Sequence, residues 1–182
     1  MLEAALALFW KNGYEATSLA DLVEATGLAK GSLYKGFGDK RTLFIRALDS
    51  YLTAARAALR DRARAASAFE ALRSWMVGAA EMATCSGVRR GCMAVNCAIE
   101  LGPHDEEVRR LLRDHEQLLE RSYVELIQRS IAEGKLRKMD PETAARWITT
   151  IIGGLQVRGK LGISRAQALE AVDLALGALA PH

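Results

Sequence analysis

Proline and cysteine are both scarce in this sequence, and each shortage excludes a class of protein. Proline occurs at only 3 of 182 positions, so few residues interrupt helical segments. The 3 cysteines cannot all pair within one chain, and they are far fewer than a disulfide-stapled scaffold carries. We therefore expect a protein of a reducing compartment, the cytoplasm.

Long apolar runs and strand-like patterns are also missing. The two best apolar segments, 147–157 and 171–180, are shorter than the roughly 18 residues that a membrane-spanning helix needs. No signal-peptide pattern opens the chain, and no stretch alternates apolar and polar residues over the length of a strand. We expect no membrane partner and no β-sheet.

What the sequence does contain predicts an all-α fold. Half of the residues are apolar, which is enough for a hydrophobic core, and Ala, Leu, Arg and Glu favour helices. Apolar spacing of three and four, together with Gly and Pro breakers, predicts nine helices, with Leu118 among the inward residues of a long seventh one. The expected helices span about residues 2–12, 17–25, 29–35, 39–64, 69–83, 91–101, 105–133, 141–160 and 164–179.

Positive charge is concentrated in one part of the chain. Residues 30–64 carry a net charge of +6, whereas the whole chain carries only +3. Such a segment is typical of a protein that binds a polyanion. A solvated helix face would give the same pattern, so the charge alone does not distinguish a polyanion-binding surface from an ordinary one.

A helix-turn-helix pattern lies at the start of this basic segment. Two short helices, 17–25 and 29–35, flank a turn that contains Gly27. In this motif the second helix enters the major groove of DNA. Its expected outward residues can contact bases or phosphates or allow close backbone approach, and they are Lys30, Gly31, Ser32, Tyr34 and Lys35. Lys40, in the first turn of the next helix, can bind a phosphate together with the free N–H groups there.

The segment TSLADLVEATGLAKGSLYKGFGDK (17–40), followed by Leu43-Phe44, resembles the DNA-binding signature of the TetR (tetracycline repressor) family. The match covers about the first 48 residues and is dense. The resemblance implies an all-helical, homodimeric, ligand-responsive regulator, usually a repressor, that needs no cofactor and binds near-palindromic operator DNA. It implies DNA contacts by Thr17, Lys30, Gly31, Ser32, Tyr34, Lys35 and Lys40.

The same resemblance divides the chain into a DNA-binding domain, 1–48, and a ligand-binding and dimerisation domain, 49–182. The chain departs from the family pattern at two points. Ala29 stands where the family usually has a capping Ser or Thr, and Gly36 stands where many members have a side chain. The basic arm that often precedes the first helix in this family is not part of this sequence.

The end of the chain has the spacing of an interhelical seam. Leu169, Val172, Leu176 and Leu179 recur at three and four residues, and Gly153 and Gly154 allow close approach of the preceding helix. We expect a two-fold homodimer built from these last two helices.

Large apolar residues predict an effector cavity among the C-terminal helices. The candidate lining is Trp75, Met93, Asn96, Tyr123, Trp147 and Ile151, which suits a small lipophilic or aromatic ligand. Each of these residues is individually more typical of ordinary core.

A thiol-based response through Cys92 is the alternative. The segment 91–100 resembles a Gly-Cys segment of TetR-family regulators that respond to electrophiles or oxidants. Cys92 is expected at a helix N-terminus after Arg89 and Arg90, and both features lower the pKa of a thiol. Inert, buried cysteines are the competing interpretation. No tight Cys or His spacing predicts a metal site.

Two other classes of protein, an enzyme and a membrane-surface protein, fit the sequence less well. An enzyme would be expected to show a nucleophile elbow, a P-loop or a dinucleotide fingerprint, and the sequence has none of these. A membrane-surface protein would need a strongly basic amphipathic helix, but the apolar face of helix 39–64 is already needed by the DNA-binding module. We therefore expect a regulator.

Overall fold

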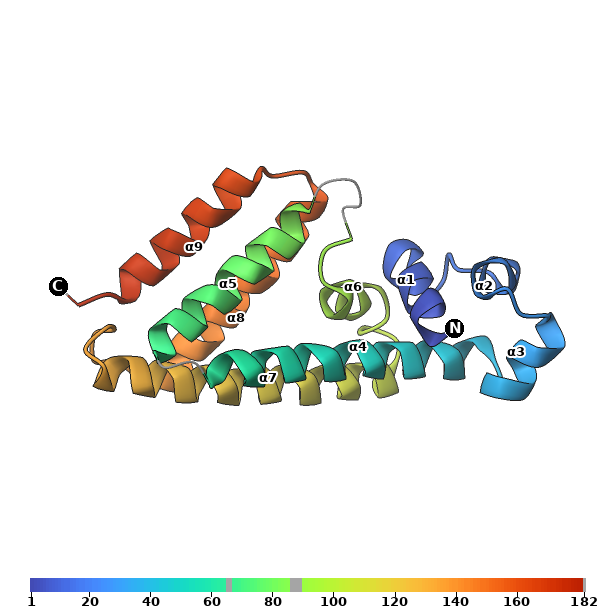
Figure 1. The fold of residues 1–182 in the computed structure, drawn as a ribbon, viewed down its shortest axis with the longest axis horizontal. Helices are drawn as coiled ribbons and strands as arrows, with labels where there is room; N and C mark the ends of the chain where they lie inside the picture. The colour runs from blue at the N-terminus through green and yellow to red at the C-terminus, as the bar shows by residue number, and fades with distance from the viewer. Residues whose placement is uncertain (65–66, 86–89, 182) are drawn as a thin grey trace. The chain divides into compact units, whose positions relative to one another are not determined.

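The computed structural model describes residues 1–64, 67–85 and 90–181, and every regular element in this part is an α-helix (Figure 1). The helices are α1 (Leu2–Asn12), α2 (Leu19–Thr26), α3 (Lys30–Phe37), α4 (Lys40–Ala63), α5 (Ala68–Thr84), α6 (Met93–Glu100), α7 (Glu106–Ala132), α8 (Pro141–Lys160) and α9 (Arg165–Leu179). The predicted all-α class and its nine helices are confirmed for the described residues. None of these helices is long and apolar enough to cross a membrane.

Local capping sets several helix starts. The Ser18 hydroxyl accepts the N–H of Asp21, and the Asp21 carboxylate accepts the N–H of Ser18, which is a capping box at the start of α2. Asp140 caps α8 ahead of Pro141. These signals lie within a few residues of each other in the chain, so the sequence places the helix starts well.

Most predicted helix boundaries are off by one or two residues, and two of these differences have a clear physical cause. The helix expected to end at Lys35 continues through Gly36 to Phe37, and the chain turns at Gly38, where φ is 85°. A glycine costs a helix only about 1 kcal/mol, so packing of Phe37 on the core outweighs it. The helix expected from Gly91 starts at Met93, because φ at Gly91 is 61°, outside the helical range.

The chain forms two compact units. One consists of Met1–Ala54 and Met93–Arg113, and the other of Ala55–Cys92 and Asp114–His182. Helices α4 and α7 each contribute residues to both units. These compact units are not the same as the functional domains expected for residues 1–48 and 49–182, and that division stays a prediction.

The core of the first unit joins the helix-turn-helix segment to α6. Phe9, Leu33 and Phe44 are buried in the same cluster as Met93 and Val108. The rings of Phe9 and Phe44 meet edge to face with centroids 5.3 Å apart. Residues 93–113 therefore belong to the core that positions α2 and α3.

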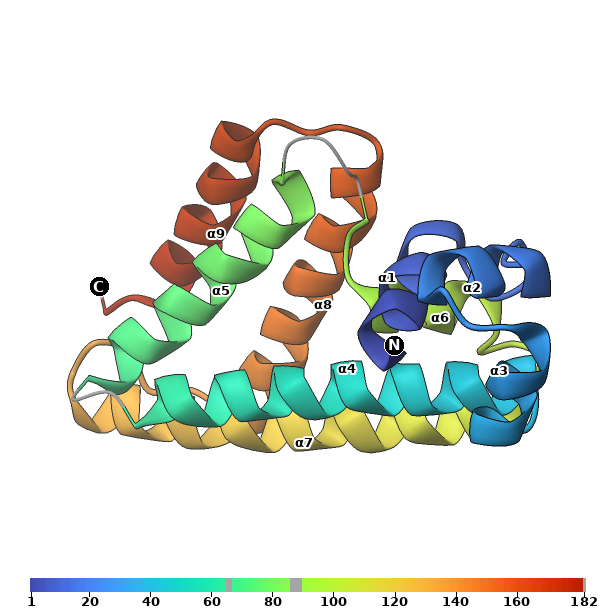
Figure 2. The same cartoon turned by 45° about the vertical axis from the view of Figure 1, so that its right-hand side comes forward.

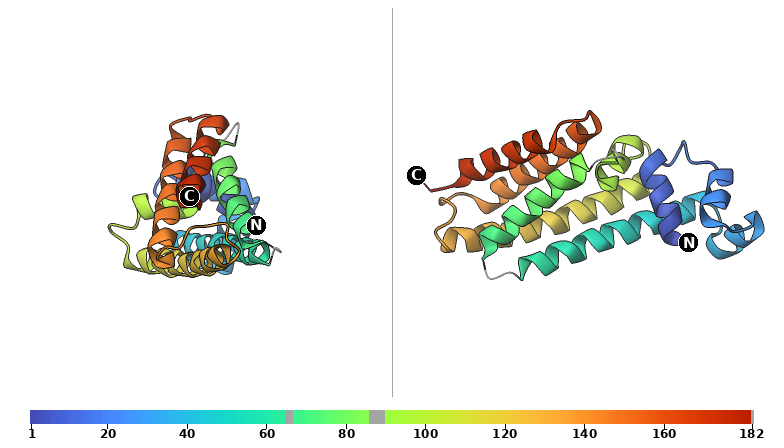
Figure 3. Two further views of the ribbon diagram at one scale, coloured as in Figure 1. Left: turned by 90° about the vertical axis from the view of Figure 1, so that its left-hand side faces the viewer. Right: turned by 45° about the horizontal axis from the view of Figure 1, so that its top comes forward.

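In the second unit α5 packs against both α8 and α9 (Figures 2 and 3). Leu72, Met76 and Ile148 are buried at the centre of its core. Leu118, which was expected to face inward, is 42% exposed, whereas Leu119 packs against this core. Adjacent helical residues point about 100° apart, so the buried face of α7 takes only one of the two leucines.

Candidate nucleic-acid interface and effector unit

The turn between α2 and α3 is built as a helix-turn-helix requires. Gly27 ends α2 in the left-handed conformation, with φ of 69°, and its N–H donates to the carbonyl of Val23. Leu22 from α2 and Leu33 from α3 are both buried in the core of the first unit. This fixes which face of α3 points outward.

The outward face of α3 is open and positively charged. Lys30, Gly31, Ser32 and Lys35 are all exposed. A Cβ added at Gly31 would meet no atom of the described residues within 4 Å, so nothing in that part of the chain covers the helix there. The predicted contact residue Tyr34 lies in α3, but its side chain lies outside the described part of the structure.

Of the remaining two predicted contacts, Thr17 lies in the segment between α1 and α2, and Lys40, the first residue of α4, contacts that segment. Thr17 is buried, and its hydroxyl donates to the carbonyl of Gly13 at 2.6 Å. The Lys40 ammonium lies 4.4 Å from the centroid of the Tyr14 ring and 3.4 Å from the carbonyl oxygen of Glu15. Both residues are therefore tied to residues 13–15.

The start of α4 is less open than the sequence predicts. The Asp39 carboxylate accepts the N–H of Thr42 at 2.6 Å, and this bond holds the pKa of Asp39 below its usual value. One of the N–H groups expected to serve a phosphate is thus already occupied. Lys40 remains the cationic group at this helix end.

Acidic residues at the end of α6 and at the start of α7 make contacts that the sequence analysis missed. Glu100 accepts the backbone N–H groups of Tyr14 and Glu15, and Arg41 bonds to both Asp105 and Glu107. The Arg41 guanidinium holds the pKa of Asp105 down at about 2. Asp105 can be recognised locally as a cap of α7, because it accepts the N–H of Val108. No sequence signal points to a partner 64 positions away.

The six predicted effector residues are divided between the two compact units. Trp75 and Tyr123 meet in the second unit, where the indole N–H donates to the buried phenol oxygen at 2.6 Å. Burial raises the pKa of Tyr123. Trp147 and Ile151 pack, half-buried, on the same core. Met93 and Asn96 lie in α6, which belongs to the first unit.

Two buried polar residues of the second unit are not among these six. Gln156 donates to the carbonyl of Ala79 at 2.8 Å, while its Oε1 has no hydrogen-bond partner among the described residues. His115 is 5% exposed, and its Nδ1 likewise lacks one within that part. Burial, with a smaller contribution from Arg56, lowers the pKa of His115 to about 4. A polar residue on an otherwise apolar helix is the sequence signal for both, and it selects Gln156 as a residue that could orient a ligand or face a dimer partner.

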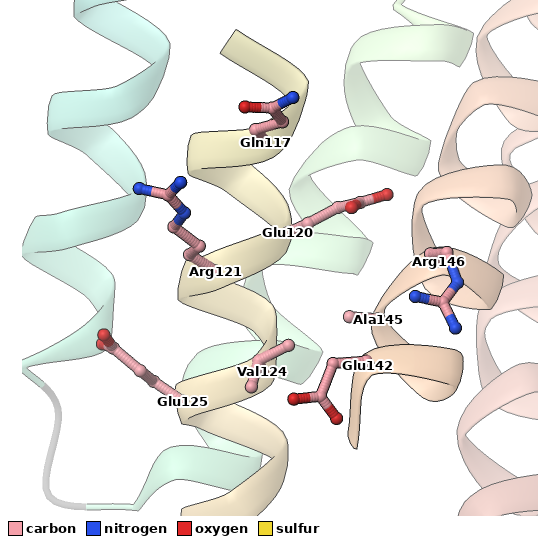
Figure 4. Close-up of a pocket in the computed structure, with 8 residues that line it drawn as sticks. All are labelled: Gln117, Glu120, Arg121, Val124, Glu125, Glu142, Ala145 and Arg146. Carbon is pink, nitrogen blue, oxygen red and sulfur yellow. The ribbon is translucent and has the colours of Figure 1, made fainter. Parts of the chain in front are cut away.

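A groove of about 370 Å³ between α7 and α8 has a different lining (Figure 4). Acidic and basic side chains dominate it, and none of the six predicted effector residues contributes. The lining consists of Gln117, Glu120, Arg121, Val124, Glu125, Glu142, Ala145 and Arg146. This mixed charge does not suit the lipophilic ligand that the sequence predicts.

The three cysteines differ in exposure. Cys92 is half-buried just before α6, Cys97 is buried within it, and Cys85 is exposed after α5. Arg89, one of the two arginines expected to act on Cys92, lies outside the described residues. Within the described ranges, no group of three or more His, Cys, Asp or Glu residues could hold a metal ion.

The predicted dimer seam on α9 is wrong. Val172, Leu176 and Leu179 are buried in the core of their own chain, and Leu169 packs against that core. Their spacing does indicate an apolar helix face. That face packs against α5 and α8 of the same chain, whose residues belong to the same core. Leu174, by contrast, is 77% exposed.

Comparison with known proteins gives consistent results over nearly the whole chain. Residues 1–47 match the model for bacterial regulatory proteins of the tetR family, and residues 68–174 match that for the tetracyclin repressor-like C-terminal domain. The HTH-type transcriptional repressor ComR of Escherichia coli K12 is 32% identical over 90% of this chain and 79% of its own. The HTH-type transcriptional repressor AcnR of Corynebacterium glutamicum is 29% identical, covering 97% of this chain and 89% of its own.

A solved structure extends the likeness to the fold. The TetR family transcriptional regulator CifR, a cysteine mutant complexed with a 26-bp double-strand operator DNA, is 34% identical with a TM-score of 0.82. The alignment covers 98% of this chain and 94% of that one. Proteins of this family are DNA-binding regulators and not enzymes. The chain belongs to the TetR family of bacterial helix-turn-helix regulatory proteins.

Proposed function

We propose that this protein is a homodimeric repressor that binds near-palindromic operator DNA and is released from it by a small lipophilic or aromatic effector. The observation that carries the DNA-binding part is the open, basic face of α3 in a helix-turn-helix, with Lys30, Ser32 and Lys35 exposed. The relatives ComR and AcnR are named as repressors, which supports repression as the direction of control. A protein that binds chromosomal operators works in the cytoplasm.

The residues of this face have different roles in the proposal. Lys30 and Ser32 read base edges, while Lys35 and Lys40 bind phosphates. Gly31 lets the helix backbone approach DNA closely, and Tyr34 completes the surface. Thr17, whose hydroxyl is bonded to Gly13, supports the segment against which Lys40 lies.

Selection of genomic fragments by the purified protein tests this function. We expect the chain to enrich a fragment with two-fold symmetry, and a Lys30→Ala, Ser32→Ala variant to lose that preference while still binding bulk DNA. Lys138→Ala is the matched control, since Lys138 is exposed outside α3 and its loss removes the same charge. Failure of the unaltered protein to enrich any fragment would contradict operator binding.

The homodimer in this proposal uses the exposed faces of α8 and α9. Gly154 and Val157 lie along one face of α8, which Leu161 follows at its C-terminal end, and Leu174 and Gly177 lie along one face of α9 at helical spacing. The two helices contact each other, so their exposed faces are neighbours. The apolar residues of this surface are well exposed: Val157 is 41% exposed, Leu161 80% and Leu174 77%.

The effector in this proposal binds in the second unit, next to Trp75 and Tyr123. The surrounding core is apolar, which favours a lipophilic molecule, and Gln156 Oε1 offers it a hydrogen-bond acceptor. A thiol response through Cys92 is the less favoured alternative, because this thiol is half-buried and buried cysteines are usually inert. A Cys92→Ser variant that keeps operator binding and its release by a reversible ligand fits the proposal.

A further inference from the structure

The short segment that joins α1 to α2 is held by a carboxylate from α6. One oxygen of Glu100 accepts the N–H of Tyr14 at 3.1 Å, and the other accepts the N–H of Glu15 at 2.9 Å. Gly13 has φ of 85°, and a Cβ there would lie 2.8 Å from the nearer Glu100 oxygen. The carboxylate therefore fits closely against a turn that only glycine readily forms.

The same segment positions two groups at the proposed DNA surface. The Thr17 hydroxyl bonds to the Gly13 carbonyl, and the Lys40 ammonium lies over the Tyr14 ring and beside the Glu15 carbonyl. The Tyr14 ring is packed in turn on Phe44, with centroids 4.8 Å apart. If the Glu100 bonds are lost, the support of Lys40 is lost with them.

A second acidic contact holds the residue next to Lys40. Arg41 donates to Asp105 and to Glu107, the latter at 2.8 Å, at the start of α7. All these residues belong to the first unit and share its core with Met93 and Cys97. Carboxylates of the segment 100–107 thus hold both the turn against which Lys40 lies and Arg41, the residue that follows Lys40.

We infer that Glu100 is a positioning residue for operator binding, with the Arg41–Asp105 pair as a second anchor. This inference rests on the proposed function. Glu100 fixes the turn against which Lys40 lies, so that the ammonium is directed towards a phosphate when α3 is in the groove. It acts through Lys40 and need not touch DNA.

The sign of the effect separates this role from plain electrostatics. A carboxylate near a DNA-binding face repels phosphates, so removing its charge alone strengthens binding to any DNA. Positioning predicts the opposite for the operator. Hydrogen bonds to a charged group are stronger than those between neutral groups, so loss of the Glu100 bonds is expected to weaken operator binding about tenfold.

Glu100→Gln tests the inference, because it removes the charge and replaces one of the two acceptor oxygens by a donor. We expect about tenfold weaker operator binding, weaker rather than tighter binding to bulk DNA, and a salt slope lower by about one, because the phosphate contact of Lys40 is lost. Glu106→Gln is the matched control: Glu106 is exposed, pairs with Arg109, and carries the same charge near the same segment. Its operator binding is expected to stay equal or become tighter.

A double-mutant cycle with Lys40→Ala distinguishes positioning from general loss of structure. In the Lys40→Ala background, Glu100→Gln is expected to cost much less than in the unaltered chain. Equal operator binding by Glu100→Gln and Glu106→Gln, or full additivity with Lys40→Ala, would overturn the inference. If Glu100→Gln fails to fold, Asp105→Asn with the same measurements decides the matter. An unaltered chain that binds no operator contradicts the proposed function instead.

Discussion

Two lysines of the proposed DNA surface, Lys35 and Lys40, differ in how much they contact the rest of the chain. Lys35 is exposed on α3, while Lys40 is half-buried against the Tyr14 ring and the Glu15 carbonyl. Removing Lys40 therefore disturbs a supported segment as well as a charge. Lys35 is the residue whose loss reports the charge alone.

Lys35→Ala is expected to weaken binding to operator and to bulk DNA by the same factor. A lysine that contacts one phosphate displaces about one counterion, so the slope of log affinity against log salt falls by about one. Fluorescence anisotropy titrations at four salt concentrations measure both quantities. A changed operator preference with an unaltered slope would assign Lys35 to base reading.

Buried His115 makes stability depend on pH in a defined window. Its pKa is about 4 in the folded chain and 6.5 is its ordinary value, so between these pH values the unfolded state binds more protons. The stabilisation is complete above pH 6.5 and is lost as the pH falls towards 4, by up to about 3 kcal/mol. Urea unfolding of the His115→Leu variant should show a smaller loss over this window.

His104→Leu is the control for that measurement, since His104 is exposed. It should leave the acid loss of stability as in the unaltered chain. All three proteins must be compared at one concentration, because dimerisation shifts apparent stability. An acid loss in His115→Leu as large as in the unaltered chain would show that other groups cause it.

At the scale of helices, local signals in the sequence predicted the helix starts well, but nothing in the sequence predicted the contacts between distant residues. Ser18 with Asp21 and Asp140 with Pro141 mark helix starts within four residues of sequence, because capping is a local contact. The partner of Glu100 lies 86 positions away, and only folding brings the two together. The acidic anchors were therefore invisible in the sequence.

The α9 seam failed for a related reason. Spacing of three and four identifies an apolar face, but it does not say whether the same chain or a second copy covers that face. In this protein the same chain covers Val172 and Leu176. The residue left for a partner, Leu174, lies between them in sequence and on another side of the helix.

Leu174→Glu is expected to give a folded monomer, whereas Val172→Glu is expected to unfold the chain. Val172 is fully buried, and an unpaired charge there costs more than about 4 kcal/mol. Leu174 is 77% exposed in the single chain, so a charge there disturbs only an interface. Light scattering gives the mass and circular dichroism the helicity. A Leu174→Glu protein that remains a dimer would exclude this face of α9.

At the scale of the whole molecule, two helices connect the parts of the proposed switch. α4 and α7 each run without a break through residues of both compact units. An effector bound beside Trp75 therefore has a continuous helical path to the segment that carries Lys40. To change the ratio of the released state to the DNA-binding state from 1:99 to 99:1, the effector must bind the released state more tightly by about 5.5 kcal/mol.

A two-fold dimer also constrains the operator. Its two recognition helices must enter major grooves about 34–36 Å apart, or a multiple of it, which is about 10–10.5 base pairs per turn. Inserting five base pairs at the centre of a selected operator turns one half-site by about half a turn to the opposite side of the duplex. We expect binding of this DNA to fall to the level of a single half-site. Replacing five central base pairs without changing the length is the control and should retain most of the affinity. Undiminished binding after the insertion would mean that the two DNA-binding units act independently, which would contradict a dimer that fixes the separation of its two recognition helices.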